Sequence, residues 1–293
     1  MAHDGQASDE WIGWKGPTQI AWATDLHLDR LPWAEAEAAV RRLVLQARQR
    51  SPRPEALVLT GDLATARQLP DVLALLAREI APGDGSGPLR TYFTLGNHDV
   101  WGATFEQVRH QAEHGPSLVR WLPTAGVRGI SPTTALVGVD GWYDGTAGAG
   151  EATEATLRDV DHITDLQGKT RRERFQAYAR LAEAEVRRAG DLIDQAIGRD
   201  YRHVVLATHV PPWARAAMYQ GRVSTPSVAP YYSCPSLGRM LERVARDHPD
   251  RTFTVLCGHA HAAVDRQIRR NLRVLVGEAD YLFPTLQPAV WVT

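Results

Sequence analysis

Five short fragments of this sequence carry side chains that can bind metal ions. They supply two aspartates, one asparagine and several histidines, and each fragment follows a short apolar run. The fragments are Asp25-Leu26-His27, Gly61-Asp62, Gly96-Asn97-His98-Asp99, Thr208-His209 and Gly258-His259-Ala260-His261. A mixed set of oxygen and imidazole donors suits Mn, Fe or Zn better than Ca or Mg. We therefore predict a centre for two transition-metal ions.

The spacing within two of the fragments fits shared ligation. Asp25 and His27 lie two residues apart at the end of a predicted strand, so both can reach one ion. His259 and His261 have the same spacing and the same option. Each ion also needs a position left free for water or substrate.

The other candidate ligands come from single positions. Two neighbouring cations repel each other, so an anionic group must lie between them, and Asp62 can bridge through its two carboxylate oxygens. Asn97 offers a neutral carbonyl oxygen, and His209 offers another imidazole. Asp25, Asp62 and Asn97 could instead cap helices. The joint occurrence of all five fragments favours metal binding.

Strands and helices alternate along the chain and would position these fragments. Strands are predicted at 19–24, 56–60, 89–95, 134–140, 203–207 and 252–257, and helices at 32–50, 71–80, 100–114, 169–197 and 237–247. Three further segments are predicted as a long surface excursion (143–168), an irregular segment (213–233), and antiparallel strands that close a second sheet (263–293). This order favours an α/β protein in which side chains at neighbouring strand ends converge.

Composition narrows the class of protein. The 293 residues are 44% hydrophobic and 23% charged, as in a soluble globular protein, and we expect a single domain with 1–16 as a flexible N-terminal segment. A net charge of −1 argues against a partner held by bulk charge, such as duplex DNA. The two cysteines, Cys234 and Cys257, lack the spacing of a zinc site. No apolar run indicates a signal peptide or a membrane span, so a cytoplasmic location is expected; the oligomeric state stays open.

The motifs and their order resemble those of the calcineurin-like metallophosphoesterase superfamily. The resemblance spans residues 25–261, and the two tetrads that begin at Gly96 and Gly258 are its most specific parts. It implies a four-layer α/β/β/α sandwich with two mixed β-sheets and with the metals between loops at the strand ends. It also implies a ligand set: Asp25, His27 and His261 for the first ion, Asn97, His209 and His259 for the second, and Asp62 as the bridge.

The resemblance further implies catalytic roles for two residues. His98 would donate a proton to the leaving oxygen, and Asp99 would orient the His98 ring. The alternatives are a substrate-orienting role for His98 and a helix cap for Asp99. The implied reaction is hydrolysis of a small phosphate ester, preferably a phosphodiester, by a metal-bridging hydroxide. A phosphomonoesterase or nucleotide pyrophosphatase with the same site is an alternative, and a non-catalytic metal-binding scaffold is disfavoured by the complete ligand set.

Some features depart from known relatives or stay open. Thr65 stands where purple acid phosphatases carry a metal-bound tyrosine, and the Asp-Arg-Gly run of protein Ser/Thr phosphatases is missing after Asp62. Both subfamilies are therefore disfavoured. The run Asp140-Gly141-Trp142-Tyr143-Asp144 could line a substrate pocket or form a packed turn. The segment that carries Tyr219, Tyr231 and Tyr232 could form a lid or a plain surface loop.

Overall fold

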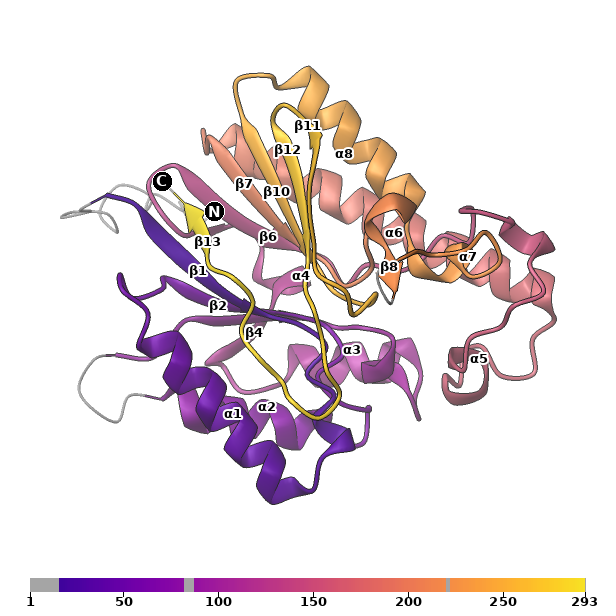
Figure 1. The fold of residues 1–293 in the computed structure, drawn as a ribbon, viewed down its shortest axis with the longest axis horizontal. Helices are drawn as coiled ribbons and strands as arrows, with labels where there is room; N and C mark the ends of the chain where they lie inside the picture. The colour runs from indigo at the N-terminus through magenta and orange to yellow at the C-terminus, as the bar shows by residue number, and fades with distance from the viewer. Residues whose placement is uncertain (1–15, 82–86, 220–221, 293) are drawn as a thin grey trace, which may run out of the picture.

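The computed structural model describes residues 16–81, 87–219 and 222–292. Most of the segment 1–16, expected to be flexible, lies outside these residues. The elements build two β-sheets that pack against each other, with helices on both outer sides (Figure 1). This arrangement confirms the predicted α/β fold with two mixed sheets.

The first sheet carries the N-terminal fragments. Its strand order is β13-β1-β2-β3-β4. The bounds are β1 (Thr18–Ala23), β2 (Ala56–Thr60), β3 (Thr91–Thr94), β4 (Val119–Trp121) and β13 (Val290–Val292). Strands β1 to β4 pair in parallel, and β13 pairs antiparallel with β1. The strand predicted over 56–60 is confirmed, whereas β3 is shorter than predicted and β4 was missed.

The second sheet carries the C-terminal fragments. Its strand order is β11-β12-β10-β7-β6-β5. The bounds are β5 (Arg128–Gly129), β6 (Thr134–Gly138), β7 (His203–Ala207), β10 (Thr252–Cys257), β11 (Val264–Arg269) and β12 (Leu272–Val276). The four central strands are parallel, and both edge strands are antiparallel. The strands predicted over 203–207 and 252–257 are confirmed.

The tail after residue 263 differs from its prediction. Only β11 and β12 form the expected antiparallel pair, while β12 pairs in parallel with β10. The chain then leaves the second sheet, and β13 joins the first one beside β1. The yellow segment in Figure 1 shows this crossing between the sheets. The tail therefore contributes strands to both sheets, because β13 pairs with the free edge of β1.

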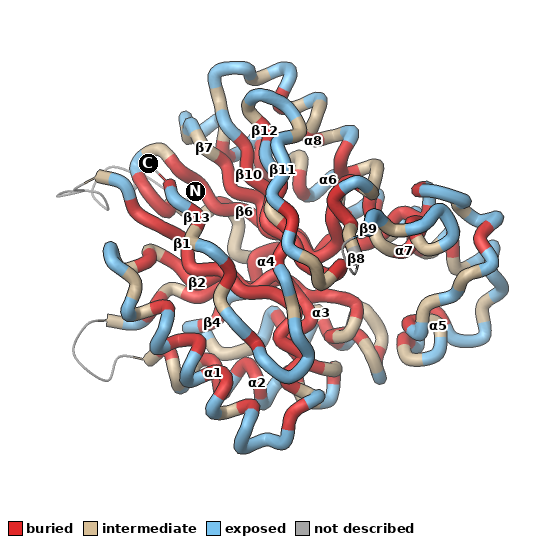
Figure 2. The backbone as a smooth tube through the Cα atoms, viewed as in Figure 1, coloured by how far each residue is buried: buried red, intermediate tan, exposed pale blue. Residues whose placement is uncertain are grey.

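Side chains point alternately to the two faces of each sheet, and this alternation produces the four layers. In β1, Ala21 and Ala23 face the helical side, whereas Ile20 and Trp22 face the second sheet. The helices are α1 (Trp33–Arg48), α2 (Leu69–Ile80) and α3 (Phe105–Glu113) on one side, and α6 (Arg171–Gly198) and α8 (Pro235–Asp247) on the other. Figure 2 shows buried strands in the middle and exposed positions on the outer helices. Among the described residues, no helix combines the length and apolar character needed to cross a bilayer.

The helix predicted over 100–114 is interrupted. A 3₁₀ turn covers His98–Val100, and Gly102 then has a φ of +90°, which ends the helical path. The helix α3 starts afresh after Thr104. The Thr104 hydroxyl accepts the Gln107 amide at 3.2 Å, and the Gln107 side chain accepts the Thr104 amide at 3.0 Å. This capping box sets the new start.

The structure adds detail to two loop predictions. The segment 143–168 runs over the surface with many exposed residues, but the buried residues Tyr143, Asp159, Ile163 and Leu166 anchor it to the core. It contains a 3₁₀ turn (Gly150–Ala152) and the short helix α5 (Asp159–His162). The segment 213–233 is less irregular than expected. It holds a 3₁₀ turn (Ala214–Ala216), the paired strands β8 (Met218–Tyr219) and β9 (Arg222–Val223), and the helix α7 (Ala229–Tyr232). The short helix α4 (Leu122–Ala125) was missed.

Candidate metal centre

The candidate ligands follow the carboxyl ends of five parallel strands, and their backbones share an unusual conformation. Five of them have positive φ values: 49° at Asp25, 42° at His27, 52° at Asp62, 66° at His259 and 56° at His261. Residues other than glycine rarely adopt this left-handed region, at a cost of about 1–2 kcal/mol each. Backbone hydrogen bonds between fragments hold it: the amides of Asp25 and His27 donate to the carbonyls of Gly61 and Asp62 at 3.1 and 2.9 Å.

The first cluster contains Asp25, His27, Asp62 and His261. One ligand atom from each residue lies within 4.8 Å of all the others. The Nε2 atoms of His27 and His261 are 3.2 Å apart, and His261 Nε2 is 3.2 Å from Asp25 Oδ1. Burial lowers the pKa of His27 to about 3, with neighbouring charges contributing less. Its ring is therefore neutral at neutral pH, which is the form that binds metals.

The second cluster contains Asn97, His209 and His259. Asn97 Oδ1 lies 3.1 Å from His209 Nε2 and 3.0 Å from His259 Nδ1, and those two nitrogens are 3.2 Å apart. The outer nitrogens of both rings lie near backbone carbonyls: His209 Nδ1 is 2.9 Å from Thr60 O, and His259 Nε2 is 2.8 Å from Tyr231 O. A carbonyl only accepts, so each outer nitrogen carries the proton and each inner nitrogen keeps its lone pair.

Asp62 lies between the two clusters. Its Oδ2 is 3.7 Å from His27 Nε2, and its Oδ1 is 3.5 Å from His209 Nε2. Burial raises the pKa of Asp62 well above its ordinary value, and the negative charges of Asp25 and Asp99 raise it further. A cation on either side would remove this electrostatic cost. The chemistry of both donor sets thus fits two transition-metal ions that share one carboxylate.

Three glycines make room for ligands of other fragments. A Cβ at Gly61 would collide with the His209 ring, and one at Gly96 with the Asp62 carboxylate. A Cβ at Gly258 would collide with the Asp25 carboxylate. The fragments are therefore interlocked, since the glycine of one accommodates the side chain of another.

His98 lies beside the clusters and contributes no atom to either. Its backbone amide donates to Asp62 Oδ1 at 2.8 Å. Its ring stacks on Trp101 with 3.8 Å between ring centres, and meets the His27 ring edge-on at 4.6 Å. Within the described chain, the buried Nδ1 atom of His98 has no hydrogen-bond partner.

The predicted contact between Asp99 and the His98 ring is absent among the described residues. The Asp99 carboxylate instead accepts the amides of Leu63 and Ala64 at 2.9 and 3.0 Å, and that of Gly96 at 2.7 Å. Burial raises the pKa of Asp99 to about 7, although these backbone hydrogen bonds oppose the shift. Asp99 ties two ligand loops together and leaves the orientation of His98 to Trp101.

Asp159 is a site residue that the sequence analysis missed. Its Oδ1 accepts the Asn97 side-chain amide at 2.9 Å and the Trp101 indole at 2.8 Å, and its Oδ2 accepts the Tyr143 hydroxyl at 2.9 Å. The first bond turns the Asn97 carbonyl oxygen towards His209 and His259. No local pattern in 143–168 marks this aspartate, so only the tertiary structure reveals it.

The two regions left open by the sequence have mainly packing roles in the described residues. Asp140 Oδ1 accepts the Leu95 amide at 2.9 Å and the Trp121 indole at 2.7 Å, which supports the packed-turn alternative. Tyr231 offers its carbonyl to His259 and donates its hydroxyl to Ala155 O at 2.8 Å.

The chain belongs to the calcineurin-like phosphoesterase family, whose profile matches residues 18–263. A dimetal phosphatase from Danio rerio has a similar fold at 13% identity, with a TM-score of 0.53 and coverage of 91% of this chain and 88% of that one. The protein TT1561 of Thermus thermophilus is similar at 15% identity, with a TM-score of 0.51 and 90% coverage of both chains. No curated protein matches the sequence significantly.

Proposed function

We propose that this protein is a binuclear metal-dependent phosphoesterase that hydrolyses a small phosphate ester. The observation that carries the proposal is the pair of donor clusters on either side of Asp62. Asp25, His27 and His261 would hold the first ion, and Asn97, His209 and His259 the second. Bound Mn, Fe or Zn ions would activate water for attack and neutralise charge on the phosphoryl oxygens.

His98 is the proposed proton donor to the leaving oxygen. Burial lowers the pKa of His98 to about 2, with smaller contributions from His27 and Arg30, so the ring is neutral without substrate. A phosphate anion beside the ring would favour the protonated form. Stacking on Trp101 keeps the ring beside the clusters while its Nδ1 makes no hydrogen bond within the described chain.

Aromatic side chains beside the first cluster favour a diester over a monoester. The Tyr281 ring centre lies 4.6 Å from that of His27 and 5.0 Å from that of His261. Leu282 and Phe283 follow it and are exposed. A second organic group on the phosphorus would find apolar contacts here, whereas a monoester would not use them. A phosphomonoesterase or nucleotide pyrophosphatase remains the alternative, and a scaffold without turnover is the third.

Metal analysis tests the centre directly. Purified protein supplied with Mn, Zn or Fe is expected to retain about two ions per chain, since two clusters of imidazole nitrogens and carboxylate or amide oxygens are present. Elemental analysis after dialysis gives the count. Protein that holds no metal under any of these conditions would disprove the proposed centre.

A substrate panel distinguishes the three hypotheses about the site. Monoesters, cyclic nucleotides, dinucleotides and nucleotide sugars are assayed with each metal supplied. Faster turnover of diesters supports the first hypothesis, whereas faster monoester or pyrophosphate hydrolysis supports the alternative. Two bound ions without turnover of any substrate would indicate a scaffold.

Changing Asp159→Ala is expected to weaken metal binding at the second cluster by about 10–100-fold, because Asn97 loses the acceptor that orients its amide. Dialysis against buffered metal, followed by elemental analysis, measures this loss. Asp159→Asn keeps one acceptor oxygen and should recover part of the affinity. Asp161→Ala, two residues away and exposed, is the matched control. Unchanged metal content in Asp159→Ala would show that Asn97 does not depend on Asp159.

A further inference from the structure

A cavity of about 560 Å³ lies at the opposite end of the sheets from the candidate metal centre. Thr91, the first residue of β3, lines it, whereas Asn97 follows the last residue of the same strand. Leu118, which directly precedes β4, and Tyr201, which precedes β7, line it as well. None of the candidate metal ligands lines this cavity.

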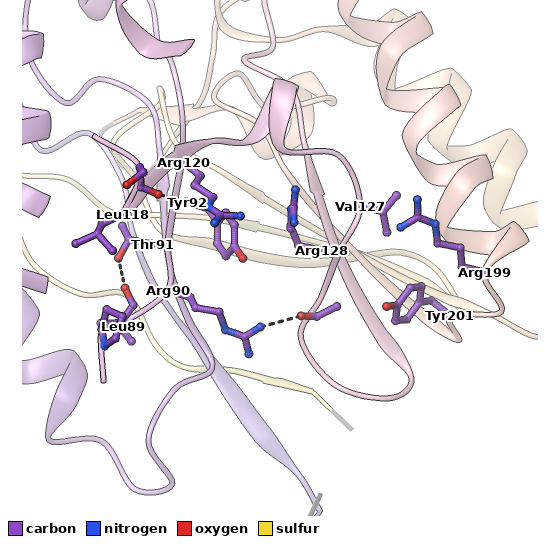
Figure 3. Close-up of a pocket in the computed structure, with 13 residues that line it drawn as sticks. Leu89, Arg90, Thr91, Tyr92, Leu118, Arg120, Val127, Arg128, Arg199 and Tyr201 are labelled. Carbon is purple, nitrogen blue, oxygen red and sulfur yellow. Dashed lines mark hydrogen bonds between the residues drawn. The ribbon is translucent and has the colours of Figure 1, made fainter. Parts of the chain in front are cut away.

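Arginine dominates the lining of the cavity. Arg90, Arg120, Arg128 and Arg199 contribute to it, and no carboxylate does. Figure 3 shows Arg120 and Arg199 extending towards Arg128 from opposite sides. Arg90 forms an ion pair with Glu55 at 2.6 Å. Across residues 16–81, 87–219 and 222–292, the other three arginines form no ion pair with a carboxylate. The cavity is therefore positively charged.

Arg128 in the lining keeps unused hydrogen-bonding capacity. One terminal nitrogen of Arg128 donates to Ala125 O, but its Nε is buried and has no partner within the described residues. A buried donor without a partner is unfavourable, and an anionic acceptor that reached it would remove this cost. Arg90 is held in place by the carbonyls of Glu55 and Gly129, at 3.1 and 3.4 Å. The wall is thus partly fixed before any ligand enters.

We propose that this cavity binds a small oligophosphate, meaning two or more linked phosphates, either free or carried by a nucleoside. Its volume lies within the range of about 300–1,000 Å³ that is typical of small-molecule sites. Guanidinium groups match phosphate oxygens in pairs, and three arginines without carboxylate partners on different walls exceed what one phosphate needs. The almost fully buried Tyr92 and the partly buried Tyr201 add aromatic surface to the lining. This site is separate from the proposed phosphoesterase centre.

Calorimetric titration of the full-length protein with pyrophosphate and with ATP tests the proposal. The double variant Arg120→Gln/Arg128→Gln is expected to bind both at least about tenfold more weakly. If the double variant folds poorly, Arg199→Glu provides a second test. It changes an exposed residue on the opposite side of the cavity and is also expected to weaken binding of both ligands. Comparable affinity for both ligands indicates recognition of the phosphate chain, and tighter ATP binding indicates an added nucleoside contact.

Two control variants distinguish binding in this cavity from binding by overall charge and from binding at the metal centre. Arg42→Gln/Arg243→Gln removes the same charge from exposed positions of α1 and α8 and should bind as the unmodified protein does. Asp62→Asn should also keep this binding. The proposal is wrong if neither ligand binds, if the control double variant loses as much affinity as the cavity variant, or if only Asp62→Asn abolishes binding.

Discussion

Asp62→Asn is expected to lower hydrolysis of bis-p-nitrophenyl phosphate by about a thousandfold or more. The two carboxylate oxygens of Asp62 face different clusters, one towards His27 and the other towards His209. Asparagine has a nearly identical shape but only one acceptor oxygen and no charge. The variant should therefore lose the shared ligand of both ions. Turnover and metal content per chain are the measurements.

Asp62→Asn should remain folded, so that a loss of turnover can be assigned to the active site and not to unfolding. The pKa of Asp62 is raised in the folded protein, chiefly by burial. A raised carboxyl pKa favours folding at low pH, and this contribution is lost as the pH rises through the folded-state value. At neutral pH, which lies above the ordinary pKa of an aspartate, Asp62 therefore costs stability when no metal is bound, because the folded protein disfavours its charge. The melting temperature of metal-free Asp62→Asn should equal or exceed that of the unmodified protein.

Asp265→Asn is the matched control for this experiment. Asp265 is exposed on β11 and pairs with Arg273, away from both clusters. Its turnover and metal content should stay unchanged. If Asp62→Asn retained full turnover, Asp62 would not be the bridging ligand, and the assignment of the centre would fail.

His98→Ala is expected to slow the hydrolysis of alkyl diesters by about 100–10,000-fold, the usual range for general acid catalysis. The loss with bis-p-nitrophenyl phosphate should be much smaller, because p-nitrophenolate leaves without needing a proton. Comparing kcat for the two ester classes measures the difference. Metal content should stay near that of the unmodified protein, since His98 contributes no atom to either cluster.

His162→Ala provides a matched control for the His98 variant. His162 stacks on the other side of Trp101, with 4.3 Å between ring centres, and so belongs to the same aromatic stack without reaching the clusters. Its effect should be small and equal for both ester classes. Equal losses for both classes in His98→Ala would instead favour the substrate-orienting alternative.

The sequence predicted the fold well where local patterns and tertiary structure agree. The strands over 56–60, 203–207 and 252–257 are rich in apolar and β-branched residues, and the structure buries nearly all of their residues. The tail could not be predicted in this way. Its strands look alike, and the partner of each one depends on which sheet edge is free. The break before α3 was predictable in principle from Gly102 and the capping pair Thr104 and Gln107.

In the candidate site, too, the sequence predicted what local motifs mark and missed what depends on tertiary contacts. The seven proposed ligands are recognisable because their types and spacing are unusual, and the structure brings all of them together. The resemblance implied that Asp99 contacts the His98 ring, whereas its side chain accepts the amides of Leu63, Ala64 and Gly96. Asp159 could not be found, because an isolated acidic residue in a polar segment carries no signal of its distant partners.

The crossing of the tail has a consequence for how the protein is made. Strand β1 is formed by residues 18–23, but its neighbour β13 comes from residues 290–292. At about 5–20 residues per second, a ribosome needs on the order of ten seconds or more to reach the second segment after the first. During that time one edge of a fully buried strand stays unpaired, and such edges promote aggregation. The nascent chain is thus most vulnerable until its last strand has been synthesised.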